Sequence, residues 1–232
     1  MKKRYNTLLL DADDTIFDFM AAERIAFFQM AKEMDIPADD EMYAAYSIIN
    51  DRHWKALERG ELTREQVLVG RYACLAEQFG LQKDPVQMNQ CYLQNLSRQT
   101  VLFDDSMEAV GELSRDFRIY IVTNGNAMVQ RGRFADSPIM QYVDGYFISG
   151  EIGYEKPDIR YFDAVFAAIP DFDPATTLLA GDSATSDLKG AINAGLDSCY
   201  VDRRGKPLPE GICPTYRVST LAELAKLLRK DN

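Results

Sequence analysis

Four short clusters of polar residues in this chain hold side chains whose types and spacing could carry out chemistry together. The clusters cover residues 11–15, 123–125, 155–158 and 181–187. Asp11, Asp13 and Asp182 offer hard carboxylate oxygens, which are the ligands that Mg²⁺ prefers. Thr123, with the turn amides beside it, can donate hydrogen bonds to phosphate oxygens, and Lys156 adds a positive charge that favours an ionised carboxylate nearby. This combination predicts phosphoryl transfer through an aspartyl phosphate.

Asp11 and Asp13 are a charged pair that directly follows an apolar run at residues 8–10. Residues two apart at the end of a strand start on the same side of the backbone, so these two carboxylates should lie close together. Like charges at such a separation are unfavourable unless a cation, a proton or a substrate compensates them. The pair therefore predicts a site that binds a compensating group.

The elements that must position these clusters alternate between strand and helix. Strand-like apolar runs cover residues 8–10, 118–123, 146–148, 177–180 and 198–201, and helical patterns cover 107–113, 161–168, 188–194 and the stretch from 220 onward. Such alternation is typical of an α/β fold with a parallel sheet and right-handed crossovers. The carboxyl ends of parallel strands meet at one edge of the sheet, where ligands bind. We therefore expect the four clusters to lie together on that edge.

A block of helices interrupts this pattern directly after the first strand. Helical patterns cover residues 21–34, 40–59, 63–79 and 84–98. The third begins with a capping-box pattern at Thr63 and Gln66 and ends at Gly80, and the fourth begins with Asp84 before Pro85. The sequence thus predicts a core domain of residues 1–16 and 100–232, with a helical domain of residues 17–99 inserted into it.

Composition excludes several classes of function. The chain of 232 residues has a formal net charge of −10, which argues against a nucleic-acid polymer as partner, because binding DNA or RNA normally uses a basic surface. The four cysteines have no close pair, and a single histidine excludes a histidine-rich metal site. The basic start precedes an apolar run too short for an export signal, and no stretch is long enough to span a bilayer. We expect a cytoplasmic protein, a monomer or homodimer, that has no membrane partner.

The order of the four clusters resembles the signature motifs of the haloacid dehalogenase (HAD) superfamily. The matching residues are Asp11-Ala12-Asp13-Asp14-Thr15, Thr123-Asn124, Lys156-Pro157 and Gly181-Asp182-Ser183 with Asp187. The helical block resembles the four-helix cap of superfamily members with a class-one cap. The resemblance implies a Rossmann-like parallel sheet core with helices on both faces and an inserted four-helix cap domain.

Further stretches resemble the bacterial pyrimidine 5′-nucleotidase branch of the superfamily. They are Asp11-Ala12-Asp13 with residues 17–19, Ile148-Ser149-Gly150-Glu151-Ile152-Gly153, Asn193-Ala194-Gly195-Leu196, Pro209-Glu210-Gly211-Ile212 and Pro214-Thr215. The branch implies a Mg-dependent phosphate monoester hydrolase, a 5′-nucleotidase acting on pyrimidine nucleoside monophosphates. Open alternatives are a phosphatase for another small phosphate, such as a sugar phosphate or phosphoglycolate, a β-phosphomutase, and a phosphoacceptor signalling domain that is not an enzyme.

The resemblance also implies a role for each motif residue. Asp11 is the nucleophile and a metal ligand, and Asp13 is the general acid and base, which ligates the metal through its backbone carbonyl. Asp182 is a direct ligand of Mg²⁺, or of Mn²⁺ in its place, and Asp187 contacts the ion through water or supports another ligand. The phosphate-binding residues are Thr123, Asn124 and Lys156. An acid two residues after the nucleophile distinguishes phosphatases from dehalogenase members, because halide leaves without a proton.

The helical block also holds candidates for substrate specificity. Trp54, the only tryptophan, can stack on a base or ring, and Asn50 and His53 can hydrogen-bond it. Phe17 and Asp18 begin the connection into the block, close to the catalytic carboxylates. Packing between helices explains Trp54 and His53 equally well.

Overall fold

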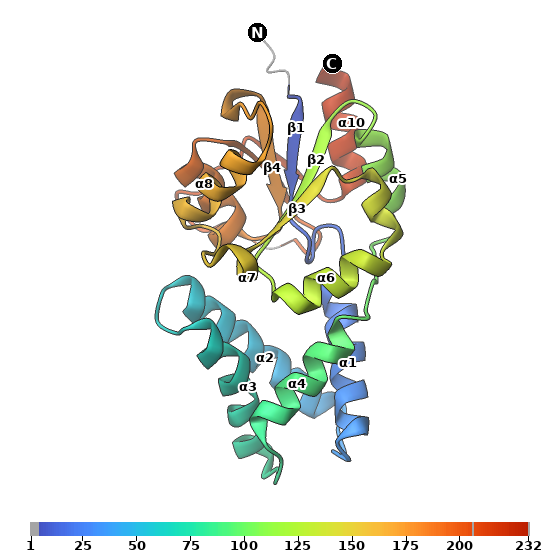
Figure 1. Ribbon diagram of the computed structural model, residues 1–232, viewed down its shortest axis with the longest axis vertical. Coiled ribbons are helices and arrows are strands. Elements are labelled where there is room, and N and C mark those ends of the chain that lie inside the picture. Colours follow the sequence, from blue (N-terminus) through green and yellow to red (C-terminus); the bar gives the residue numbers. More distant parts are fainter. Residues whose placement is uncertain (1–4, 206, 232) are drawn as a thin grey trace.

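A parallel sheet lies at the centre of the computed structural model, which describes residues 5–205 and 207–231 (Figure 1). In this part of the chain the strand order is β3-β2-β1-β4-β5-β6, and all neighbouring strands run parallel. The strands are β1 (Thr7–Leu10), β2 (Arg118–Thr123), β3 (Gly145–Ile148), β4 (Thr177–Gly181), β5 (Asp197–Val201) and β6 (Tyr216–Val218). The predicted α/β fold with a Rossmann-like sheet is confirmed. Strands β1 and β4 pair where the strand order reverses direction, and open sheets bind their ligands at this point.

Helices cover both faces of the sheet. Leu8 and Leu10 of β1 pack in an apolar cluster with α5 (Ser106–Leu113) and α10 (Leu221–Asp231). Leu9 points to the other face, where it packs with α8 (Ile159–Ala168) and α9 (Lys189–Ala194). All three leucines are fully buried. A strand buried on both faces can be apolar at every position, which explains the unbroken run at residues 8–10.

Four helices lie beyond the carboxyl ends of the strands and pack on one another (Figure 1). These inserted helices are α1 (Phe19–Glu33), α2 (Asp40–Glu58), α3 (Arg64–Phe79) and α4 (Pro85–Leu96). The predicted capping box is present, since the Thr63 side chain accepts from the Gln66 amide and the Gln66 side chain accepts from the Thr63 amide. Asp84 caps α4 as expected. Local capping signals thus explain why the helix starts could be predicted.

The chain enters and leaves the inserted helices through two segments that pair with each other. Phe17 forms an antiparallel bridge with Leu102. The Asp18 amide next to it donates a hydrogen bond to the Val101 carbonyl at 3.0 Å. Both connections are therefore tied together directly beyond the end of β1.

Shorter elements complete the fold. Helix α6 (Ala127–Asp136) follows β2 and lies between the sheet and α4, and α7 (Ser149–Ile152) follows β3 (Figure 1). The described residues also include the 3₁₀ helices Pro138–Tyr142 and Pro174–Thr176 and a π-helical turn, Ala184–Leu188. Within residues 5–205 and 207–231, no helix combines the length and the apolar character that crossing a membrane requires.

Candidate active site

The carboxyl ends of three neighbouring strands carry the predicted site residues. Asp11 follows β1 directly, and its backbone amide donates to the Ala180 carbonyl of β4 at 2.9 Å. Thr123 is the last residue of β2, and Asp182 follows β4. Lys156 comes from the loop after α7 and is 1% exposed. The structure therefore brings the four sequence clusters together at one edge of the sheet.

The Lys156 ammonium donates three hydrogen bonds inside the protein. Its acceptors are Asp11 Oδ1 at 2.7 Å, Asp187 Oδ1 at 2.6 Å and the Val122 carbonyl at 2.7 Å. Burial alone would lower the pKa of Lys156, but the Asp11 and Asp187 carboxylates outweigh burial and raise that pKa above its usual value. Lys156 is therefore a fixed positive charge between two carboxylates.

Asn124 holds the backbone of Lys156 in place. Its side-chain amide donates to the Lys156 carbonyl at 2.8 Å and accepts from the Lys156 backbone amide at 2.8 Å. Both ends of the side chain are engaged in this way. A contact between Asn124 and phosphate would therefore fall to its backbone amide, while the side chain positions the lysine.

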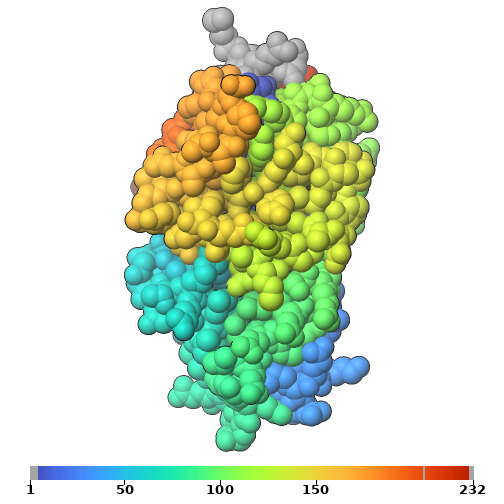
Figure 2. All heavy atoms as spheres, in the orientation of Figure 1, coloured from blue at the N-terminus to red at the C-terminus, as the bar shows by residue number. Residues whose placement is uncertain are grey.

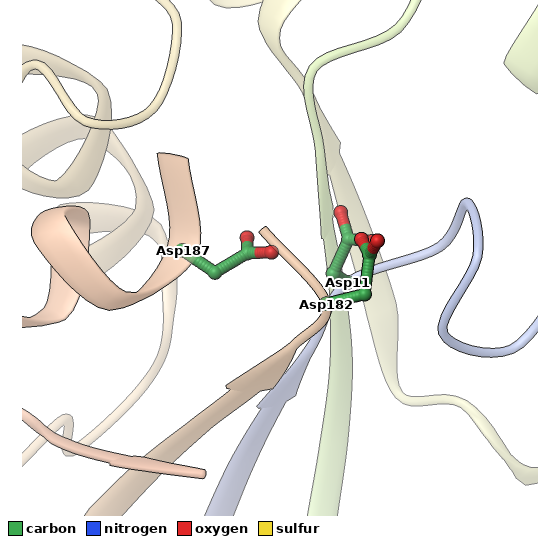
Figure 3. Close-up of side chains that lie close together, drawn as sticks. All are labelled: Asp11, Asp182 and Asp187. Atoms are coloured by element: carbon green, nitrogen blue, oxygen red, sulfur yellow. The ribbon is translucent and has the colours of Figure 1, made fainter. Parts of the chain in front are cut away.

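Asp11, Asp182 and Asp187 form an acidic cluster (Figure 3). Among the described residues, one carboxylate oxygen from each lies within 4.8 Å of the others. Figure 3 shows Asp11 and Asp182 side by side at the strand ends, with Asp187 extending toward them from its helical turn. Burial raises the pKa of Asp11; Lys156 opposes this shift, and the carboxylates of Asp187 and Asp182 add to it. The cluster thus holds more negative charge than Lys156 compensates, and its oxygens are those that a hard cation prefers.

Gly181 leaves the space that Asp187 occupies. A Cβ atom at this position would lie 2.2 Å from Asp187 Oδ2. The same oxygen accepts a hydrogen bond from the Ser183 amide at 3.0 Å, so its position is held from the backbone. The last residue of β4 must therefore be glycine for Asp187 to join the cluster.

The Asp13 carboxylate is not hydrogen-bonded to Lys156 but is bound by side chains of α6. It accepts hydrogen bonds from Gln130 Nε2 at 2.9 Å and from Arg133 Nη1. Gln130 Nε2 also donates to Thr123 Oγ1 at 2.9 Å, so one amide links Asp13 to Thr123. Arg133 is fully buried, with its guanidinium 4.6 Å from the centroid of the Phe17 ring. The Asp13 carboxylate is therefore held by two side chains of α6, and the metal contact of its backbone carbonyl stays a prediction.

A cavity of about 220 Å³ separates the strand ends from the inserted helices. Asp11, Asp13, Thr123 and Asp182 are among the residues that line it on the strand side. On the helix side its lining includes Phe19, Trp54, Leu57, Leu68, Arg71 and Tyr92. The volume lies below the usual range of about 300–1,000 Å³ for ligand pockets, so the cavity suits a small molecule.

Helix α2 contributes Trp54 to the cavity lining, but not Asn50 or His53. Asn50 lies one turn earlier in the helix, where side chains of α1 and α3 hydrogen-bond it. A ring nitrogen of His53 lies 2.8 Å from the Ile49 carbonyl, and the ring packs against Gly70 of α3. Asn50 is buried between the neighbouring helices and His53 is partly buried, so contact of either side chain with substrate stays a prediction.

Phe17 and Asp18 also lie outside the cavity lining. Phe17 is fully buried, with its ring centroid 6.0 Å from that of Phe134. The Asp18 side chain caps α1 by accepting from the Ala21 amide at 3.1 Å. These two residues anchor the entry into the inserted helices, and their contact with substrate stays a prediction.

Arg64, the first residue of α3, joins the inserted helices to the edge of the site. It donates hydrogen bonds to the Gly125 carbonyl at 3.0 Å, to Ser149 Oγ at 2.7 Å and to Glu155 Oε1 at 2.9 Å. Figure 2 shows the corresponding surfaces in contact, the cyan start of α3 against the gold segment that contains Glu155. The Arg64 guanidinium also lies 5.7 Å from the Trp54 ring centroid. The inserted helices therefore contact the strand-end loops directly and cover the cavity.

Comparison with protein families identifies the family to which this chain belongs. A family model that describes haloacid dehalogenase-like hydrolases matches residues 5–195, which include all four polar clusters. The chain belongs to the haloacid dehalogenase-like hydrolases. This confirms the resemblance that the motif order indicated.

The relatives of this haloacid dehalogenase-like hydrolase include proteins that match over nearly its whole length. It is 39% identical over 230 residues to the HAD-hydrolase YfnB of Bacillus subtilis, covering 99% of this chain and 98% of YfnB. The orthorhombic crystal form of YfnB bound to magnesium has a TM-score of 0.94 and covers 97% of this chain and 99% of that one. The pyrimidine 5′-nucleotidase PynA of Streptococcus pneumoniae is 32% identical, covering 98% of this chain and 96% of PynA. The pyrimidine 5′-nucleotidase YjjG of Escherichia coli is 29% identical, covering 98% of this chain and 99% of YjjG.

Three side chains that line the cavity were not predicted from the sequence. They are Gln130, Arg133 and Arg71. Gln130 and Arg133 are three residues apart on α6 and so share one face of the helix. Arg71 falls three residues after Leu68 and four before Leu75, within the apolar stripe of α3. A charged residue in an apolar stripe is a signal that would have marked Arg71, since arginine is rarely buried without partners.

Proposed function

We propose that this haloacid dehalogenase-like hydrolase is a Mg²⁺-dependent phosphate monoester hydrolase that acts through an aspartyl phosphate on Asp11. We further propose pyrimidine nucleoside 5′-monophosphates as its substrates. The position of Asp11 carries the proposal: its carboxylate belongs to the acidic cluster, accepts from Lys156 at 2.7 Å and lines the cavity beneath the inserted helices. In this proposal residues 17–99 are a cap domain over a core of residues 1–16 and 100–232.

The acidic cluster supports the magnesium requirement. Three carboxylates beside one lysine leave negative charge uncompensated, and their oxygens fit a hard divalent cation. Asp11, Asp182 and Asp187 would hold Mg²⁺ together with the Asp13 backbone carbonyl, and Mn²⁺ accepts the same donors. The ion, when bound, neutralises charge that develops on the transferring phosphoryl group. The related YfnB crystal structure is described as bound to magnesium.

Asp11 and Asp13 divide the proposed reaction between them. The Asp11 carboxylate attacks phosphorus, the bond from phosphorus to the leaving oxygen breaks, and Asp13 gives that oxygen a proton. Asp13 then takes a proton from the water that attacks the aspartyl phosphate, which releases phosphate and regenerates Asp11. Gln130 and Arg133 each donate a hydrogen bond to one Asp13 oxygen. To carry and deliver a proton, Asp13 must turn one of these oxygens away from its donor, so the two donors control its orientation.

Lys156 and Thr123 supply the positive charge and the hydroxyl that receive the phosphoryl group. Lys156 already donates three hydrogen bonds, which is all that an ammonium group has. Its bond to Asp11 is the one that phosphoryl oxygens would replace once Asp11 is phosphorylated. Gln130 keeps the Thr123 hydroxyl at a set distance from Asp13 through one shared amide nitrogen. Preorganised donors of this kind usually make the largest contribution to such catalysis.

Two observations support a nucleotide as the substrate. The relatives PynA and YjjG are named pyrimidine 5′-nucleotidases, and each match covers 98% of this chain. Trp54 lines the cavity and offers an aromatic face on which a base can stack. Sugar phosphates and phosphoglycolate have no aromatic ring to place there, and a phosphoacceptor signalling domain needs no substrate cavity. A β-phosphomutase would use the same carboxylates but would release no phosphate.

A substrate panel with an Asp11→Asn variant tests the proposal. Phosphate release is measured with Mg²⁺ on uridine, cytidine and adenosine 5′-monophosphates, ribose 5-phosphate, phosphoglycolate and glucose 1-phosphate. We expect the wild type to favour the pyrimidine nucleotides, to lose activity when the metal is chelated, and Asp11→Asn to be inactive but folded by circular dichroism. Turnover by Asp11→Asn would exclude Asp11 as the nucleophile. Isomerisation of a sugar phosphate without phosphate release would instead identify a mutase.

A further inference from the structure

A network of polar side chains is buried inside the inserted helices, on the helix side of the cavity. Arg71 of α3 is 2% exposed and donates to Asn50 Oδ1 at 2.7 Å and to Asn89 Oδ1 at 3.0 Å. Asn50 in turn donates to Glu23 Oε1 at 2.6 Å. Side chains from α1, α2 and α4 thus surround the guanidinium. Arg71 is therefore held in one orientation, as a side chain that recognises a ligand must be.

Two buried polar groups beside this network have no hydrogen-bond partner among the described residues. They are Arg71 Nε and the hydroxyl of Tyr92 on α4. Both residues line the cavity, and the Arg71 guanidinium lies 5.0 Å from the Tyr92 ring centroid. A buried donor without an acceptor costs on the order of 1–3 kcal/mol, and nearly all buried polar groups in native proteins have a partner. Because both residues contribute to the cavity wall, a ligand bound there is a candidate for the missing acceptor.

The charges around Arg71 indicate which kind of acceptor fits. The Glu23 carboxyl faces Arg71 through Asn50, and burial raises the pKa of Glu23 to about 7, so above this pH its negative charge balances the guanidinium. The other cavity-lining residues on α3 and α4 are apolar, namely Leu68, Leu93 and Leu96. A second anion on the substrate would upset the balance between Arg71 and Glu23. A neutral carbonyl oxygen would complete the network without adding charge.

We propose that Arg71 and Tyr92 form a subsite for a ring carbonyl of the nucleobase. The inference rests on the proposed nucleotidase function and specifies which part of the nucleotide the inserted helices recognise. Uracil, thymine and cytosine each carry a ring carbonyl, whereas adenine carries none. The subsite accordingly favours pyrimidine over adenine nucleotides. Ribose 5-phosphate can place its phosphate at the strand ends, but it leaves both donors unpaired.

The main test is the effect of Arg71→Lys on uridine 5′-monophosphate compared with ribose 5-phosphate. Lysine keeps the positive charge opposite Glu23 but lacks the Nε donor and the planar fork of arginine. Assayed with Mg²⁺ near pH 8, where Glu23 is ionised, kcat/KM for uridine 5′-monophosphate should fall at least about tenfold. The value for ribose 5-phosphate should stay within about twofold, since no base is present. Arg52→Lys, at an exposed position of α2, is the matched control and should change neither value.

Tyr92→Phe is a second variant that keeps the inference testable if Arg71→Lys fails to fold. It removes the hydroxyl alone and leaves the ring that packs in the inserted helices. We expect a selective loss on uridine 5′-monophosphate, smaller than that of Arg71→Lys, and no loss on ribose 5-phosphate. Thermal unfolding of each variant shows whether the fold is retained.

Each remaining outcome contradicts a defined part of the proposal. Equal losses on both substrates would assign Arg71 and Tyr92 to the stability of the inserted helices and overturn the subsite. A loss confined to phosphoglycolate would also overturn it, because the subsite would then bind a carboxylate. A wild type that hydrolyses other phosphates but no nucleotide would refute the nucleotidase function, and the subsite with it. The wild-type panel thus decides the function, and the ratio of variant to wild type decides the subsite.

Discussion

Replacing Glu23 with glutamine should remove a pH dependence from the stability of this protein. The Glu23 side chain is 2% exposed and accepts hydrogen bonds from Asn50 at 2.6 Å and from the Tyr43 hydroxyl at 3.3 Å. Burial raises the pKa of its carboxyl from 4.5 to about 7, against the opposing attraction of Arg71. Glutamine is similar in shape and neutral at every pH, so the variant isolates this ionisation.

The direction of the pKa shift gives the sign of the effect. The unfolded chain releases the Glu23 proton near 4.5, whereas the folded protein keeps it until about 7. The contribution of Glu23 therefore favours the folded state at low pH, and this contribution is lost as the pH rises through this window. Because one unit of pKa shift equals about 1.4 kcal/mol, the whole effect is about 3 kcal/mol. About 2.5 kcal/mol of it falls between roughly pH 5 and pH 8.

Urea unfolding of Glu23→Gln and wild type across this pH range measures the effect as a difference in the free energy of unfolding. The difference should move in favour of the variant by about 2.5 kcal/mol as the pH rises from roughly 5 to 8. Glu77→Gln, at an exposed position of α3, is the matched control, for which the difference should be flat. A constant difference for Glu23→Gln would refute the reasoning, since ionisation of Glu23 would then not be coupled to folding.

Two further substitutions test the walls of the cavity and the acidic cluster. Trp54→Ala should raise KM for uridine 5′-monophosphate with little change for p-nitrophenyl phosphate, because the indole lines the cavity. Steady-state kinetics on both substrates measure the change in KM. Equal losses of activity on the two substrates would show that Trp54 acts in helix packing and not in recognition of the base. Gly181→Ala should raise the Mg²⁺ concentration for half-maximal activity at least about tenfold. The added methyl carbon would lie 2.2 Å from Asp187 Oδ2 and would therefore displace that carboxylate. Phosphate release is measured as a function of magnesium concentration. An unchanged midpoint would show that Asp187 does not contribute to metal binding.

Local signals in the sequence were enough to predict the sheet edge and most of its side chains. The strands are short and buried on both faces, so each appears as an apolar run that ends where a polar cluster begins. Asp11 and Asp182 could be placed together because parallel strands end on the same edge. The starts of α3 and α4 could be predicted because Thr63 and Asp84 cap them through hydrogen bonds within one turn.

Contacts between distant segments could not be predicted in this way. Asn50 and Trp54 lie on the same face of α2, yet one binds Arg71 and the other lines the cavity, because neighbouring helices enclose only the first. Helix α6 places Gln130 and Arg133 against Asp13, more than a hundred residues earlier in the chain. Helical periodicity gives the face of a residue, but it does not identify the side chains that pack on that face.

The bridge between Phe17 and Leu102 makes the inserted helices an exchangeable module. The chain leaves the α/β part of the protein and returns to it at nearly the same point, so the surrounding fold does not depend on the length of what lies between. The inserted helices also have an apolar core built mainly from their own side chains. A different set of helices grafted between these two residues would leave Asp11 and Lys156 in place and change the cavity wall that faces the strand ends. New cavity walls can therefore evolve on this scaffold while the carboxylates at the strand ends stay the same.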